Sequence, residues 1–164
     1  MELTHHPIAA NNFLFGVSNF LVLPLPAAWE LVRGPFEPEV DRQIRRGDTS
    51  WVQEGRTTYL LIHRGRRATV ECHIAIAQRW TPLHFPSGKE AWRRGQIEIG
   101  GHAAAYVLGT QLRGWWSRKR VVMLRTAFYC NALARRIDIE LLGEGSEEGH
   151  LHELLQAFCQ VQCH

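Results

Sequence analysis

The stretch Gln96-Ile-Glu-Ile-Gly-Gly-His102 opens the part of the chain that decides the fold, which runs on to residue 142. Apolar segments at residues 102–112 and 121–130 flank a short polar stretch, and residues 136–142 alternate between apolar and charged side chains. Side chains of a strand point alternately to opposite faces of a sheet, so each of these segments is expected to be a strand. Because short polar turns separate them, the strands are expected to pair as antiparallel hairpins.

Further strands are expected on the N-terminal side of this stretch, at residues 13–17, 19–25, 29–32, 57–63 and 67–77. The last two are expected to form a hairpin around Gly65, because a residue without a side chain suits a tight turn. Pro24 and Pro26 are expected to end the first strand region, since proline has no backbone donor. Residues 1–12 are expected to be a loose lead-in to the domain.

Helices are expected at residues 39–46, at residues 87–94 and near the C-terminal end of the chain. The last of these has a single apolar stripe, formed by Leu151, Leu154, Leu155, Phe158 and Val161. Together the elements predict one domain over residues 1–164, of the α+β class: a largely antiparallel β-sheet packed with helices as an α/β/α sandwich. Its core is expected to lie on the apolar faces of these elements and to include Val70, Ile74, Leu124, Phe128, Ile139, Leu155 and Phe158.

The composition is that of an ordinary globular protein, with 45% hydrophobic and 21% charged residues and a net charge of +3. The chain therefore lacks the composition of a disordered protein, whereas a net charge of +3 neither favours nor excludes a nucleic-acid partner. No Lys or Arg precedes Arg33, and the apolar run before it is too short to span a bilayer. We therefore expect a cytoplasmic protein that does not bind a membrane and whose cysteines are reduced.

The order of the expected elements resembles that of the PsbP-like family. The resemblance rests on Phe20-Leu-Val-Leu-Pro24 followed by Trp29-Glu-Leu-Val32, on Ile97-Glu-Ile-Gly-Gly-His-Ala-Ala-Ala-Tyr106, and on the amphipathic helix at the C-terminal end. It implies an antiparallel sheet flanked by helices. It also implies a protein that binds partners rather than one that catalyses a reaction.

The cysteines are the residues most suited to a metal site. Cys159-Gln-Val-Gln-Cys163-His164 would place two thiols one turn apart if the helix continued, and Cys72 or Cys130 could complete a thiolate site for zinc. The alternatives are thiols that pack as small apolar groups, or a disulfide. Because the chain has no Cys-x2-Cys pair, we expect packed thiols, with no metal and no cofactor.

Histidines and acids offer further candidates for chemistry. His102 follows Gly100-Gly101 and could act as a general base near neutral pH, although a hydrogen-bonded strand residue is the simpler interpretation. Asp138 and Glu140 are expected on the same strand face as Arg136, which indicates ion pairing rather than catalysis.

The polar tip between the strands expected at residues 102–112 and 121–130 is the best candidate for a contact surface. It contains two adjacent tryptophans beside basic side chains: Arg113, Trp115, Trp116, Arg118, Lys119 and Arg120. Such residues serve protein contacts and also stack on nucleic-acid bases. A third interpretation is that one tryptophan folds back onto the core.

These observations favour a small intracellular binding or adaptor module that is not an enzyme and that binds a protein partner or a second copy of itself. One alternative is a thiol- or metal-dependent enzyme using Cys130, Cys159, Cys163 and His102. Another is a nucleic-acid accessory factor that uses the basic tip.

Overall fold

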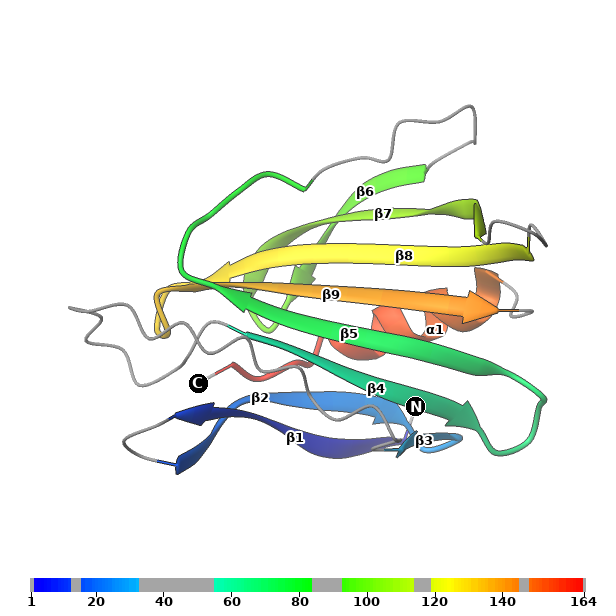
Figure 1. Ribbon diagram of the computed structural model, residues 1–164, viewed down its shortest axis with the longest axis horizontal. Helices are drawn as coiled ribbons and strands as arrows, with labels where there is room; N and C mark the ends of the chain where they lie inside the picture. The colour runs from blue at the N-terminus through cyan, green and yellow to red at the C-terminus, as the bar shows by residue number, and fades with distance from the viewer. Residues whose placement is uncertain are drawn as a thin grey trace.

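A computed structural model of the chain describes residues 2–12, 16–32, 55–83, 93–113, 119–144 and 148–163. In these ranges the chain forms a long antiparallel sheet, a separate two-stranded hairpin and one helix (Figure 1). The helix packs against β2 of the hairpin and against β8 of the long sheet, and buried residues of all three belong to one core.

The long sheet has the strand order β3-β4-β5-β9-β8-β7-β6, and all its described pairings are antiparallel. Sequence neighbours pair throughout, except where β5 meets β9. The strands span Trp29–Val32 (β3), Gly55–His63 (β4), Thr69–Ala77 (β5), Arg93–Ile99 (β6), His102–Arg113 (β7), Lys119–Cys130 (β8) and Arg135–Glu144 (β9). The strands and hairpins expected over residues 57–77 and 96–142 are therefore confirmed.

The two-stranded hairpin consists of β1, Leu3–Asn12, and β2, Gly16–Pro26. Residues 1–12, expected to be loose, therefore contribute a complete strand. Pro24 lies inside β2 and pairs with His5 of β1, whereas Pro26 is the last residue of β2, as expected, and pairs with Leu3. A sheet of only two strands accommodates them because each strand is an edge, and proline is tolerated on edges.

The inner face of the long sheet carries the core. Every residue expected in the core is at most 3% exposed, and Val70, Leu124, Phe128 and Phe158 are fully buried. The helix α1, Glu148–Phe158, packs the expected stripe of Leu151, Leu154, Leu155 and Phe158 against this core. Val161 is buried as well, but it lies beyond the end of the helix. Among the described helices, none combines the length and apolar character that crossing a bilayer requires.

The expected α+β class, with an α/β/α sandwich, is wrong: the protein is mostly β, with two antiparallel sheets and a single short helix in the described residues. The helix expected at residues 87–94 is wrong for the two of these residues that the structure describes, because Arg93 and Arg94 begin β6. Local helix signals there are overridden by pairing with β7, which joins Arg93 to Leu108 and Arg94 to Val107. The helix expected at residues 39–46 lies outside the described residues.

The outer face of the long sheet is polar and extensively ion-paired. Arg125 Nε lies 2.6 Å from Glu140 Oε2, and Arg136 pairs with Asp138 on the same strand. The expected pairing of Arg136 is thus confirmed for Asp138, whereas Glu140 pairs with Arg125 of the neighbouring strand β8. Burial raises the pKa of Asp138, and the Arg136 guanidinium acts in the opposite direction.

Candidate metal centre

The segment that follows α1 is fixed in place by backbone hydrogen bonds. Val22 of β2 and Gln162 exchange a reciprocal pair, with N···O distances of 2.6 and 3.2 Å. The Gly100 amide donates to the carbonyl of Cys159 at 3.0 Å. The C-terminal segment is therefore held between the β1–β2 hairpin and the turn that joins β6 to β7.

That turn explains the Gly100-Gly101 pair. Ile99 and His102 are the last paired residues on either side of a two-residue turn, and the φ angles of Gly100 and Gly101 are +56° and +80°. A turn with two positive φ angles favours glycine at both positions. Gly100 is restricted further, because a Cβ atom there would lie 2.2 Å from the carbonyl oxygen of Val161. The turn packs closely on the C-terminal segment and places His102 beside it.

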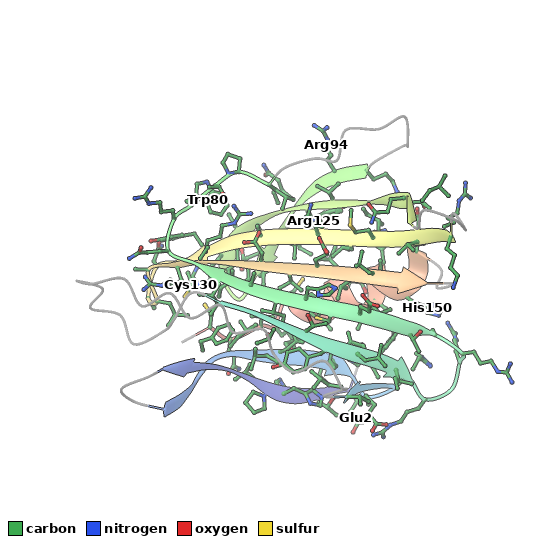
Figure 2. The ribbon with its side chains drawn as sticks, in the orientation of Figure 1. Glu2, Trp80, Arg94, Arg125, Cys130 and His150 are labelled. Atoms are coloured by element: carbon green, nitrogen blue, oxygen red, sulfur yellow. The ribbon has the colours of Figure 1, made fainter. Side chains whose placement is uncertain are left out.

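Three potential metal ligands meet at this point: His102 at the start of β7, Cys130 at the end of β8, and Cys163 in the C-terminal segment. The Cys163 sulfur lies 3.3 Å from His102 Nε2 and 2.7 Å from the Cys130 sulfur. All three ligand atoms lie within 4.8 Å of one another. Figure 2 shows Cys130 at the end of the sheet close to the C-terminal segment.

The surroundings of the cluster are largely dry. Cys130 is fully buried and Cys163 is 1% exposed. Burial, with a further contribution from the hydrogen bond to Cys130, raises the pKa of the Cys163 thiol to about 12. The His102 ring stacks on the buried ring of Phe128, with centroids 5.7 Å apart and planes at 12°. The imidazole is therefore oriented by packing as well as by its contact with sulfur.

The other two cysteines do not join the cluster. Cys72 is fully buried on the inner face of β5, and burial raises its pKa to about 12. Cys159 is exposed, and its thiol lies 3.8 Å from the carbonyl of Leu155. The helical spacing expected for Cys159 and Cys163 is wrong because α1 ends at Phe158. An extended segment, rather than another turn of helix, carries Cys163 to Cys130.

A second group of histidines lies near the other end of α1. The ring of buried Trp29 meets His63 and His150 edge-on, at centroid distances of 5.1 and 5.9 Å. Trp29 Nε1 donates to Glu153 at 3.4 Å, and Arg66 lies 3.3 Å from His150 Nε2. The rings of Trp29, His63 and His150 therefore form an aromatic cluster through contacts between ring faces and edges.

A pocket of about 210 Å³ opens on the outer face of the sheet. Its charged lining includes the paired Arg125 and Glu140 together with Asp138 and His73. A hydrogen bond of 2.8 Å joins His73 Nδ1 and Thr58 Oγ1. Ion pairing already satisfies much of this lining, so the pocket offers less to a ligand than the thiol–imidazole cluster does.

Part of the tip singled out in the sequence can be located. Lys119 and Arg120 are exposed at the start of β8, and Arg113 ends β7 opposite Lys119. Trp115, Trp116 and Arg118 lie outside the described residues.

From the sequence, all three members of the cluster are grouped, together with Cys159, only in the alternative of a thiol- or metal-dependent enzyme. The zinc site expected from the cysteines combines Cys159 and Cys163 with Cys72 or Cys130, and it does not include His102. The missing signal was the Gly100-Gly101 turn, whose close approach to residue 161 brings His102 to Cys163. Comparisons with protein-family models, curated proteins and solved structures found no match to this chain.

Proposed function

We propose that the protein is a zinc-binding module in which Cys130, Cys163 and His102 hold the ion and the metal stabilises the domain. The observation that carries this proposal is the convergence of two sulfurs and an imidazole nitrogen from three segments that are far apart in the sequence. It departs from the expectation of packed thiols, because the Cys163 sulfur contacts both His102 Nε2 and the sulfur of Cys130, so that three potential ligands converge.

The donor set suits zinc. Thiolate sulfur and imidazole nitrogen are its usual protein ligands, with bonds of roughly 2.3 Å to sulfur and 2.0–2.1 Å to nitrogen. Those bond lengths place ligand atoms of a tetrahedral centre roughly 3.5 to 3.8 Å apart. The 3.3 Å between Cys163 and His102 is close to this value, whereas the two sulfurs, 2.7 Å apart, must separate by about 1 Å.

Burial favours a structural role over a catalytic one. Cys130 and Cys163 are inaccessible, and the raised pKa of Cys163 keeps the metal-free thiol protonated and a poor nucleophile. A bound zinc ion would deprotonate the thiols and connect the C-terminal segment to the ends of β7 and β8. This supports a non-enzymatic binding module rather than a thiol-dependent enzyme.

Metal content tests the proposal directly. Protein purified under reducing conditions without chelators should carry one zinc per chain by native mass spectrometry and elemental analysis. Cobalt substitution should give the charge-transfer absorption of a thiolate–cobalt bond. Cys130→Ser, Cys163→Ser and His102→Ala should each lower zinc affinity at least about tenfold, as loss of a ligand or its support commonly does.

Cys159→Ser is the matched control, because Cys159 lies in the same C-terminal segment but is exposed and outside the cluster. It should leave zinc content unchanged. His164, the next residue after Cys163, lies outside the described residues, and His164→Ala measures whether a fourth protein ligand contributes. A reduced protein that takes up no zinc, and that instead loses two hydrogen atoms to a Cys130–Cys163 disulfide in air, would replace the metal proposal with a redox pair.

A further inference from the structure

Strand β6 forms one edge of the long sheet as far as the described residues show, because its pairing there is with β7 alone. Its side chains alternate in exposure. Arg94, Gln96 and Glu98 are exposed on the outer face, whereas Gly95, Ile97 and Ile99 face inward and are partly or fully buried. Figure 2 shows Arg94 at the border of the molecule beside β6. The strand has seven residues and contains no proline.

We propose that two copies of this chain pair through β6, antiparallel and centred on Gln96, to form a continuous sheet across a two-fold axis. This inference is independent of the metal centre. It gives the expected self-association a specific surface that differs from the tryptophan tip.

Charge complementarity fixes the register. In an antiparallel pair related by a two-fold axis normal to the sheet, directly opposite residues lie on the same face. Centring the pair on Gln96 places Arg94 opposite the partner's Glu98, and the symmetry produces this ion pair twice. Opposite charges facing each other across strands favour pairing, and like charges oppose it.

The inner face of β6 is also compatible with this register. Gly95 leaves room for the ring of Tyr106, because a Cβ atom there would lie 2.4 Å from the ring. An aromatic ring laid over an edge glycine covers its exposed backbone. The proposed register sets Ile97 of one copy opposite the partner's Gly95, so that the isoleucine side chain meets the ring that covers this glycine.

Natural sheets commonly protect edge strands with charges, proline or bulges that prevent pairing. The charges on β6 have a different effect, since Arg94 and Glu98 attract one another when the strand meets a second copy of itself. A strand of unrelated sequence would not place opposite charges against both Arg94 and Glu98. The edge is therefore selective for its own sequence.

Charge exchange provides the test, with dimerisation followed by analytical ultracentrifugation. Glu98→Arg and Arg94→Glu should each weaken the dimer about tenfold or more, because attraction becomes repulsion at both symmetry-related positions. The double variant Arg94→Glu/Glu98→Arg should dimerise again. An equimolar mixture of the two single variants should form a heterodimer, although each alone is monomeric.

Cross-linking tests the register independently. In a Cys159→Ser background, Gln96→Cys should form an intermolecular disulfide, because the two copies of residue 96 face each other at the axis. Ala103→Cys is the control, since Ala103 is also exposed but belongs to β7. It should not cross-link.

Three results would overturn the proposal: a wild-type chain that stays monomeric at high micromolar concentration, single charge variants that dimerise as wild type does, or a double variant that fails to recover. Loss of the dimer in Trp115→Ser/Trp116→Ser, with the β6 variants unaffected, would assign self-association to the tip instead. Circular dichroism of each variant confirms that the fold is retained.

Discussion

The two ends of α1 are attached to the rest of the molecule by different chemistry. Near its start, Trp29, His63 and His150 meet through ring faces and edges, with Glu153 and Arg66 at the periphery. Beyond its end, Cys163 meets Cys130 and His102 through the atoms that carry lone pairs. The labels of His150 and Cys130 in Figure 2 mark these opposite ends of the molecule.

The comparison shows that histidine content alone does not identify a metal site. Two imidazoles lie near the start of α1, at a centroid distance of 6.0 Å, yet they belong to an aromatic cluster. Beyond its end, the described part of the chain brings in the imidazole of His102, whose nitrogen lies within 4.8 Å of two sulfurs. The direction of the donor atoms is therefore a better guide than the number of potential ligands.

The largest expected effect is at the aromatic end. Trp29→Ala should lower the free energy of unfolding by about 3 to 5 kcal/mol, because it removes a fully buried ring from the core. Urea denaturation measures this loss. Trp80→Ala is the control: Trp80 is 50% exposed and contacts Arg136 through its ring at 5.5 Å, so its loss should cost only about 1 kcal/mol. Similar losses for both variants would show that Trp29 does not secure this end of the helix.

Removing the metal should have the next largest effect, and it should act on the segment beyond the C-terminal end of α1. Free zinc at 100 times its dissociation constant stabilises a folded protein by about 2.7 kcal/mol. Chelation should therefore lower the melting temperature by about 5 to 10 °C in a domain of this size. In Cys163→Ser the chelator should have no further effect. An unchanged melting temperature on chelation of the wild-type protein would argue against a structural metal.

The Gly100 turn gives a smaller and more specific effect. Gly100→Ala combines an unfavourable φ with a collision against the Val161 carbonyl and should cost about 2 kcal/mol. Gly101→Ala is the matched control, because Gly101 also has a positive φ but nothing lies within 4 Å of its Cβ position. It should cost about 1 kcal/mol. Only Gly100→Ala should also weaken zinc binding, since it displaces residue 161 and with it Cys163.

The smallest effect is expected at the hydrogen bond between Trp29 and Glu153. Its length of 3.4 Å and partial burial indicate a weak contact. Glu153→Gln should therefore change the free energy of unfolding by about 0.5 kcal/mol or less and leave zinc content unaltered. A loss above 2 kcal/mol in thermal denaturation would mean that polar contacts, rather than ring packing, hold this end.

Alternation in the sequence predicted most of the sheet. Residues such as Val70, Ile74 and Ile139 were assigned to the buried face from their period alone, and all three are buried. Alternation with period 2 can be recognised in a short stretch of sequence, so it does not require knowledge of which strands pair. The pairing of β5 with β9 was not predicted, because it joins segments that no turn connects.

The incorrect expectations also have a physical cause. Ser87-Gly-Lys-Glu90 has the pattern of a helix-capping box and favours a helix up to Arg94. Pairing of Arg93 and Arg94 with β7 provides strand hydrogen bonds that this local signal does not outweigh. Residues 3–12 lack strong apolar alternation, yet pairing with β2 makes them a strand. For the candidate metal centre, the residue types were visible in the sequence. Their meeting depends on a turn, a strand end and a terminal segment that only the three-dimensional fold brings together.

The pairing of β5 with β9 indicates where the chain could be cut into two fragments. Each half of the long sheet is built from sequence neighbours, and this one ladder, from Val70–Gly143 to Ala77–Arg136, joins them. A chain cut between β5 and β6 would leave two fragments with one matching edge each, and α1 of the second fragment would still have β2 of the first to pack on. The domain is thus suited to reassembly from two separately expressed pieces, as in a split reporter.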